Sequence, residues 1–147
     1  MAESPKDAVE LRNSVQDAVT QWFKRNAYTT EEMLESNDES DPAIEISASG
    51  RSFPHILMVG VHVNVSAPRI KLEYDVRAQF RHEFGDPVAR PLVAEFVRET
   101  GAPMLLGMVR GAIATESAIF EQGKILLPFL IEEQLRALPD EAFVDNE

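Results

Sequence analysis

The sequence predicts an α+β fold, in which a four-stranded antiparallel sheet carries helices on one of its faces. The clearest observation is residues 69–84, where every odd position is polar and the even positions from Ile70 to Phe84 are apolar except His82. Because successive side chains of a strand point to opposite faces, this period of two predicts a long strand with one solvated and one buried face. Nearer the C-terminus apolar residues recur at helical spacing, and Pro91 and Pro103 suit the first turns of helices.

Further strands are predicted in the middle of the chain. Residues 44–49 alternate between apolar and polar side chains, and residues 49–52 (Ser-Gly-Arg-Ser) have the composition of a turn. The valines from Val59 to Val65 occupy alternate positions, which places them on one face of a strand. Residues 125–131 are very apolar but contain a proline, which predicts an edge or an extended segment.

The N-terminal segment is predicted to form a helix over residues 6–25. Five apolar residues recur there at spacings of three and four, which places them on one helix face: Ala8, Leu11, Val15, Ala18 and Trp22. This stripe must cover either the body of its own chain or another subunit. The run that follows, residues 31–41, is acidic at six of eleven positions, which is typical of a solvated loop or of the negative half of a docking site.

The C-terminal third is predicted to contain two helices, followed by a short helix over residues 132–138 and an acidic tail. Pro91 begins the first helix and Gly101 ends it, and the second runs from Pro103 to Gly123. One side of the second helix carries small residues: Gly107, Gly111, Thr115 (or Ala114) and Ala118. Each helical glycine costs about 1 kcal/mol relative to alanine. The stripe therefore indicates a close backbone contact, either with the sheet of the same chain or with a helix across a subunit interface.

The composition is that of a globular protein and excludes several function classes. The chain has 147 residues, of which 44% are hydrophobic and 27% charged. The absence of cysteine excludes disulfides, thiolate metal sites and cysteine catalysis. The 14 Lys+Arg against 25 Asp+Glu give a net charge of −11, which argues against nucleic acid as a partner. The sequence has neither a membrane span nor a signal-peptide core, so we expect a soluble, cytoplasmic protein.

The sequence offers no catalytic constellation. His55, His62 and His82 lack the spacing of metal ligands on a common element, and we expect surface or structural roles for them. A glycine-rich phosphate loop and a nucleophile elbow are both missing. Glu73 and Asp75 share a strand face but have basic neighbours on it, so a carboxylate acid/base pair is not expected. We therefore expect neither an enzyme nor a bound cofactor or metal.

A small sheet with two helices cannot hide all of this apolar surface, so we expect an oligomer, or open grooves for a partner. Candidate groove residues are the large apolar side chains of the 69–84 strand and of the C-terminal third, for each of which an ordinary core position is the alternative: Phe80, Phe84, Phe96, Leu105, Met108, Phe120, Leu127 and Phe129.

The order of the elements resembles the SecB export chaperones and the SecB-like chaperones linked to toxin–antitoxin systems. The resemblance covers roughly residues 27–131. The matching segments are residues 27–35 for the family's first strand, 43–49 for the second, 59–67 for the third, 70–80 with Glu73 for the fourth, 105–113 with Arg110 for the opening of the long helix, and Leu126-Leu127-Pro128 for a later Leu-x-Pro run. The chain departs from the family at Gly107, Gly111 and Leu130-Ile131, and by its extra N-terminal helix.

The resemblance implies a dimer of dimers that binds unfolded or extended client chains without ATP, for export or for the protection of a partner such as an antitoxin. The acidic positions that meet the SecA-type export motor in the family fall on Glu31, Glu35 and Glu73. The predicted division is an N-terminal helical extension (1–26), a SecB-like domain (27–138) and an acidic C-terminal tail (139–147).

Two alternatives to a chaperone remain. A non-chaperone adaptor would dock one folded partner through its acidic edge, with a strong dependence on salt. A small-molecule enzyme or carrier would contain an enclosed apolar pocket with convergent polar groups.

Overall fold

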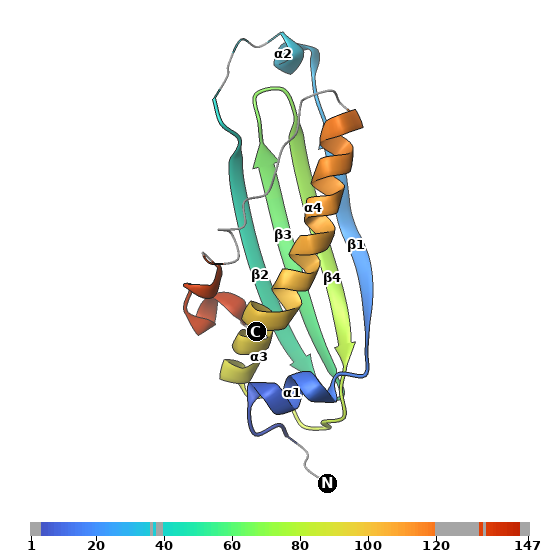
Figure 1. The fold of residues 1–147 in the computed structure, drawn as a ribbon, viewed down its shortest axis with the longest axis vertical. Helices are drawn as coiled ribbons and strands as arrows, with labels where there is room; N and C mark the ends of the chain where they lie inside the picture. The colour runs from blue at the N-terminus through green and yellow to red at the C-terminus, as the bar shows by residue number, and fades with distance from the viewer. Residues whose placement is uncertain (1–3, 36, 38–39, 120–132, 134, 145–147) are drawn as a thin grey trace.

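The computed structural model describes residues 4–35, 37, 40–119, 133 and 135–144, and its centre is one antiparallel sheet in the order β1-β4-β3-β2 (Figure 1). The strands are β1 (Asp17–Tyr28), β2 (Ala43–Phe53), β3 (Ile56–Ser66) and β4 (Lys71–Arg81). The helices are α1 (Ala8–Ser14), α2 (Glu31–Leu34), α3 (Arg90–Phe96) and α4 (Ala102–Ile119), with a π-helical turn η1 (Val97–Gly101) and a 3-10 turn η2 (Asp140–Phe143).

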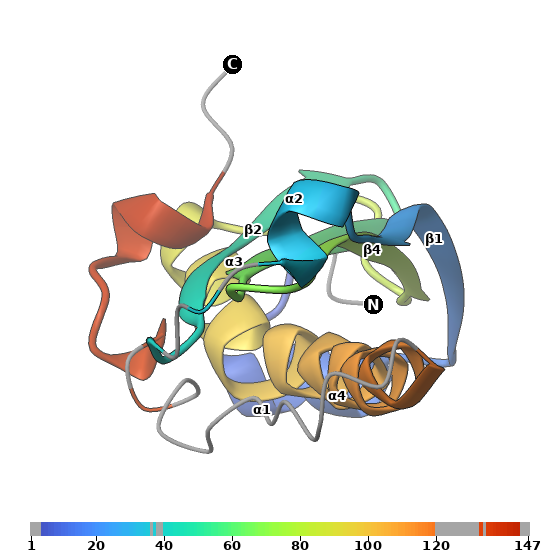
Figure 2. The ribbon, with the colours of Figure 1, turned by 90° about the horizontal axis from the view of Figure 1, so that it is seen from above.

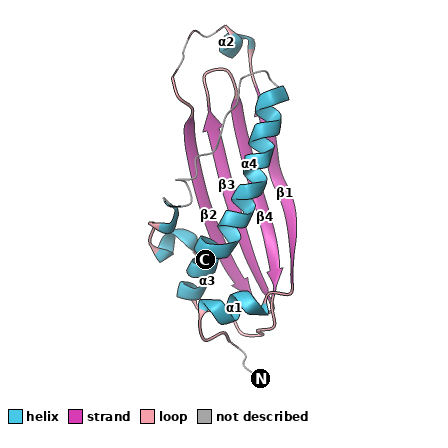
Figure 3. Cartoon of the chain, viewed as in Figure 1, coloured by secondary structure: helices cyan, strands magenta, loops and turns pink. Residues whose placement is uncertain are grey.

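The core lies between the sheet and the helix layer. Figure 2 shows α1 and α4 on the same side of the sheet, and α4 runs obliquely over β3 and β4 (Figure 3). The register pairs Val61 with Val76 and Val63 with Tyr74, so the alternating apolar rows of β3 and β4 lie side by side and are buried. The predicted α+β class and the predicted faces of these two strands are confirmed.

The predicted N-terminal helix is correct only over its first part. Asp7 caps α1, its carboxylate accepting a hydrogen bond from the Glu10 N–H at 2.8 Å, and the chain turns to extended backbone at Val15. Residues 17–28 instead form β1, which pairs with β4 over its whole length. Ala18 and Trp22 are four residues apart, a spacing that fits one face of a strand as well as one face of a helix. The predicted boundary at residue 26 therefore falls inside a strand of the sheet.

Gly50 is predicted to lie in a turn and Gly101 to end a helix, but in the structure both glycines allow close packing instead. β2 continues through Gly50 to Phe53, and the turn into β3 lies at Pro54-His55, where His55 has φ 63°. A Cβ on Gly50 would lie 2.5 Å from Val97 Cγ2, so glycine lets the helix layer approach this strand. Gly101 does not end a helix either, because η1 joins α3 directly to α4, and its Cβ would lie 2.9 Å from the methyl groups of Val59.

Other predicted boundaries change less. The strand predicted over 69–84 ends at Arg81, but His82 and Phe84 stay buried. α4 ends at Ile119, and Gly123 and the segment 125–131 lie outside the described residues. Residues 133, 135 and 136 are helical, within the short helix predicted there. The predicted acidic tail is folded at its start, since η2 packs beside α3 and β2 with Phe143 buried.

Candidate protein-binding surfaces

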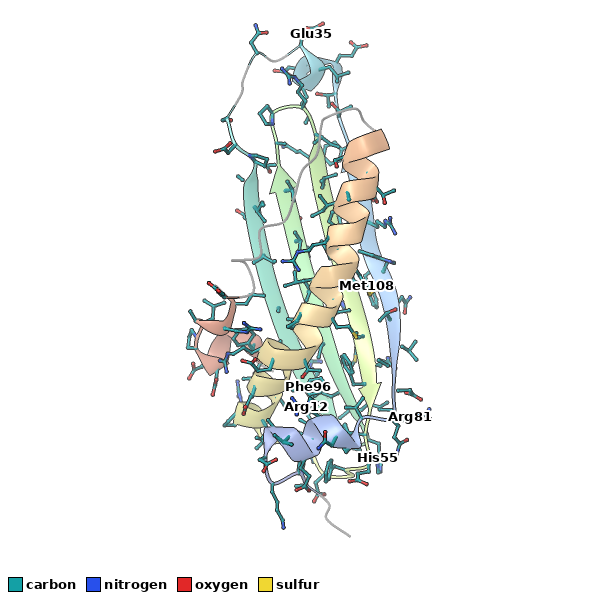
Figure 4. The ribbon with its side chains drawn as sticks, in the orientation of Figure 1. Arg12, Glu35, His55, Arg81, Phe96 and Met108 are labelled. Atoms are coloured by element: carbon teal, nitrogen blue, oxygen red, sulfur yellow. The ribbon has the colours of Figure 1, made fainter. Side chains whose placement is uncertain are left out.

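Four of the predicted groove residues are core residues. Phe80, Phe84, Phe96 and Leu105 are all at most 3% exposed, and the rings of Phe80 and Phe96 pack edge to face at 5.0 Å. They hold the helix layer against the sheet, so they cannot touch a client while the chain is folded, and this part of the prediction is wrong. Met108, labelled in Figure 4, is half-buried against the core. Phe120, Leu127 and Phe129 lie outside the described residues.

We define the small-residue face of α4 as Gly107, Gly111, Thr115 and Ala118, and the first three of these residues are not packed on the sheet. Gly107, Gly111 and Thr115 are exposed, and a Cβ added to either glycine would meet nothing within 4 Å. The side chain of Ala118 lies outside the described part of the structure. The Thr115 hydroxyl donates to the Gly111 carbonyl at 3.0 Å, which keeps its side chain along the helix. Packing against the chain's own sheet, one of the two explanations of the stripe, is therefore wrong.

The edge strand β1 exposes large apolar side chains that the sequence prediction missed. Val19 is 65% exposed, Phe23 52% and Tyr28 41%. The register shifts between Trp22 and Lys24, a bulge that puts Phe23 beside the Arg77 guanidinium at 4.2 Å on the outer face of the sheet. A sequence signal was present, since the β-branched and aromatic residues from Val19 to Phe23 favour a strand.

A polar and aromatic joint connects β1 to α4. The Arg25 guanidinium donates to both carboxylate oxygens of Glu116, at 2.7 and 3.4 Å, and lies 5.0 Å from the Trp22 ring centroid. Trp22 in turn packs on Tyr74 at 5.9 Å between ring centroids. Burial raises the pKa of Tyr74, whose hydroxyl has no hydrogen-bond partner among the described residues. The joint fixes the exposed edge strand to the helix layer.

On the outer face of the sheet the side chains of β4 are polar, and its two carboxylates, Glu73 and Asp75, are paired with cations. Lys24 Nζ lies 2.5 Å from Glu73 Oε2, and this hydrogen bond lowers the pKa of Glu73. Asp75 accepts from the Arg77 guanidinium at 3.3 Å. Neither carboxylate is therefore placed to act as a general acid or base. A hollow of about 400 Å³ lies over Gly60 on this face, lined by small and charged side chains such as Ser49, Arg77 and Asp75.

The predicted motor-docking acids do not share a strand. β1 ends at Tyr28, and the Thr30 hydroxyl accepts from the Met33 N–H at 3.1 Å, which begins α2. Glu31 and Glu35 are therefore exposed on or beside a single helical turn beyond the end of the sheet, where Figure 4 labels Glu35. Glu73 lies on the outer face of β4 and is engaged by Lys24. The placement of 27–35 as a first strand is wrong beyond Tyr28.

The histidines do not converge on a metal site. Among the described residues no group of three His, Asp or Glu side chains could hold a metal ion. His82 is buried, and its Nδ1 accepts from the Phe84 N–H at 3.1 Å, as expected of a structural histidine. His55 closes the β2–β3 turn, where its N–H donates to the Phe84 carbonyl at 2.9 Å. The side chain of His62 is 43% exposed, on the outer face of the sheet.

Within the part of the chain that the structure describes, the longest helices are too short or too polar to cross a lipid bilayer.

Comparison with known proteins gives a match in structure but not in sequence. No protein-family model matches the chain, and no curated protein matches it in sequence. The fold is similar to a solved structure of the Mycobacterium tuberculosis Rv1957 SecB-like chaperone, which is in complex with a ChAD peptide from the Rv1956 HigA1 antitoxin. The TM-score is 0.63 at 11% sequence identity, and the match covers 79% of this chain and 86% of the other. The predicted resemblance is confirmed at the level of the fold, and this chain has the fold of a SecB-like chaperone.

Proposed function

We propose that the chain is an ATP-independent holdase, a non-enzymatic chaperone that binds unfolded or extended polypeptides as a homo-oligomer. The observation that carries the proposal is the apolar edge strand, where Val19, Phe23 and Tyr28 remain exposed although the inner faces of β3 and β4 are buried. Exposed apolar groups of this size mark surfaces for other chains. The similar chaperone fold, solved with a bound peptide, supports a peptide as the ligand.

The chemistry of an edge strand suits extended clients. β1 has twelve residues and, among the residues that the structure describes, pairs with β4 on one side only, so its other side presents N–H and C=O groups that no described strand pairs. An extended chain adds hydrogen bonds there, and its apolar side chains contact those of β1. Folded proteins hide such segments, which makes the surface selective for non-native chains. Ordering each client residue costs about 1–2 kcal/mol, so one short contact binds weakly.

Several weak contacts along one client then require several copies of the surface. Linked sites raise avidity without any new contact. The small-residue face of α4 supports assembly, because Gly107 and Gly111 leave room for a helix of another subunit to approach closely. We propose a dimer of dimers in which Gly107, Gly111, Thr115 and Ala118 lie at a subunit interface.

The partner is proposed to be a client peptide rather than an export motor. Of the three acids carried over from the family, Glu73 is already paired with Lys24, Glu31 lies on α2, and Glu35 follows α2 as its C-cap, so neither Glu31 nor Glu35 lies on a strand. The similar chaperone is solved with an antitoxin peptide. These two observations favour protection of a specific partner, such as an antitoxin, over general export.

The test is aggregation of a denatured protein followed by light scattering without nucleotide. We expect the chain to suppress the scattering, and its native mass to be four times 16.4 kDa. Changing Val19 and Phe23 together to serine should weaken suppression, whereas Gln79→Ser on the outer face of β4 should not. A 16.4 kDa monomer with no effect on aggregation would reject the proposal. Binding to one folded protein, with strong salt dependence and no effect on unfolded chains, would favour the adaptor instead.

A further inference from the structure

The second edge of the sheet, formed by β2, is contacted at Gly50 by the C-terminal residues 139–144, which we call the strap. Val144 forms a parallel bridge to Gly50 in β2, and η2 lies beside α3 and β2 (Figure 1). The strap therefore adds a short extended segment to the sheet edge, in the manner of a bound peptide.

A single aromatic side chain anchors the strap. Phe143 is fully buried and Val144 half-buried, whereas residues 139–142 are exposed. A segment held this way contributes one deeply buried ring and little else to the core. This is the pattern of an anchored peptide, in which one aromatic fills a pocket.

Arg98 of η1 makes three chemically different contacts with the strap and with Leu138, the residue before it. Its guanidinium lies 4.9 Å from the Phe143 ring centroid, donates to Asp140 Oδ1 at 2.9 Å and donates to the Leu138 carbonyl at 3.1 Å. Its Nε is buried without a hydrogen-bond partner among the described residues. Arg98 thus recognises an aromatic ring, a carboxylate and a backbone carbonyl of an extended segment, with one donor to spare.

We call the surface under the strap the seat, and it is built by elements outside the strap: Gly50 of β2, which Val144 meets, Arg98 and Val97 of η1, and Val93 of α3. Gly50 has no side chain, and Val93 of α3 and Val97 of η1 approach it so closely that a Cβ there would lie 3.0 and 2.5 Å from their methyl groups. Val93 and Val97 are buried members of the main core. The seat is therefore part of the sheet and the helix layer, and does not depend on the strap for its framework.

We propose that this seat is a peptide-docking site, which the strap occupies in cis and which a client segment of the same chemistry occupies in trans. The proposal deepens the proposed function, since it names the kind of segment a client would offer: an extended stretch with an acidic residue three positions before an aromatic one, followed by a β-branched residue. Charge supports this occupant, because Arg98 gives an acidic segment a cation in a chain whose net charge is −11. The tether gives the strap a high effective concentration, so only a suitable segment displaces it.

The first experiment measures fluorescence anisotropy of the labelled peptide Leu-Pro-Asp-Glu-Ala-Phe-Val, the sequence of residues 138–144, added to the full-length chain. If the strap occupies the seat nine-tenths of the time, the free seat binds about tenfold more tightly than the intact chain. We therefore expect Phe143→Ser to tighten peptide binding about tenfold or more. The matched peptide with serine in place of phenylalanine should not bind to the same variant. Equal, weak binding of both peptides would overturn the proposal.

A second experiment leaves the anchor intact, in case Phe143→Ser impairs folding. The chain has no cysteine, so Ala142→Cys places a single nitroxide label on an exposed residue of the strap. Excess peptide should release the strap and narrow the spectrum, and the serine-substituted peptide should not. An unchanged spectrum at saturating peptide would contradict the proposal. If the intact chain suppresses aggregation and the label does not respond to peptide, the holdase proposal is supported and the docking-site proposal is rejected. If the label responds to peptide and the intact chain does not suppress aggregation, the docking-site proposal is supported and the holdase proposal is rejected.

Discussion

The two faces of α4 differ in how their residues are used. The inner face carries Leu105, Leu106, Val109 and Ile113, all fully buried against the sheet. The outer face carries Gly107, Gly111 and Thr115, all exposed. The large side chains are consumed by the fold, and the surface left for other chains is made of small ones. Contact of α4 with another subunit is therefore expected on its small-residue face, and not on its apolar inner face.

The largest effect should come from removing bulk on the inner face. Leu105→Ala removes a fully buried side chain, which should lower the free energy of unfolding by about 2–5 kcal/mol. Urea denaturation followed by circular dichroism measures it. Met104, its neighbour in sequence, is 37% exposed, so Met104→Ala should cost far less. If Leu105→Ala instead weakened client capture and left stability unchanged, Leu105 would be a groove residue after all.

Adding bulk on the outer face should change assembly instead of folding. Nothing lies within 4 Å of a Cβ on Gly107, so a leucine fits the single chain. At a close helix contact the same leucine is overpacked, at a cost of about 1–3 kcal/mol for each copy. Gly107→Leu should therefore lower the native mass, measured by light scattering, without loss of helical signal. Lys6→Leu, an exposed substitution outside α4, serves as the control. An unchanged mass would remove Gly107 from the interface.

The strands of the core were predictable because burial on one face dictates their pattern. In β4 the residues from Leu72 to Phe80 at even positions are buried, and the same holds for alternate positions of β3. β1 was not predictable in the same way. It is an edge strand with a bulge after Trp22, so its pattern is interrupted, and the helical stripe of α1 runs into it without a break.

The binding surfaces were harder to predict than the fold. Phe80 and Phe96 have the same appearance in the sequence whether they line a groove or fill a core, and only the helix layer that covers them decides between the two. The glycines of α4 were more informative, because an unusual helix residue needs a specific reason. Phe143 was hidden in an acidic stretch that composition alone describes as a solvated tail.

Burial of His82 should make the free energy of unfolding depend on pH. Burial first, and the charge of His55 second, lower the pKa of His82. Protonation is therefore favoured in the unfolded chain, so stability is complete above the ordinary histidine pKa of about 6.5 and is lost as the pH falls below it. One proton gives a slope of at most about 1.4 kcal/mol per pH unit. The free energy of unfolding, measured by urea denaturation at pH values from 7 to 5, should depend less on pH in His82→Phe than in the unaltered chain. The control His62→Gln, at a side chain that is 43% exposed, should leave this dependence unchanged. An unaltered slope in the His82 variant would show that other groups cause it.

The smallest expected effect, that of Gly111→Ala on stability, should change sign with protein concentration. Gly111→Ala adds a methyl group that meets nothing within 4 Å in the single chain, so the higher helix propensity of alanine should raise the free energy of unfolding by about 1 kcal/mol in dilute samples. In concentrated samples, where subunits pack on this face, the methyl group should separate the helices and lower the melting temperature. Ala112→Gly, which removes a buried methyl group from the inner face, should destabilise the chain at every concentration. A Gly111→Ala variant that is more stable under both conditions would mean that the small-residue face stays open to solvent and is not a subunit interface.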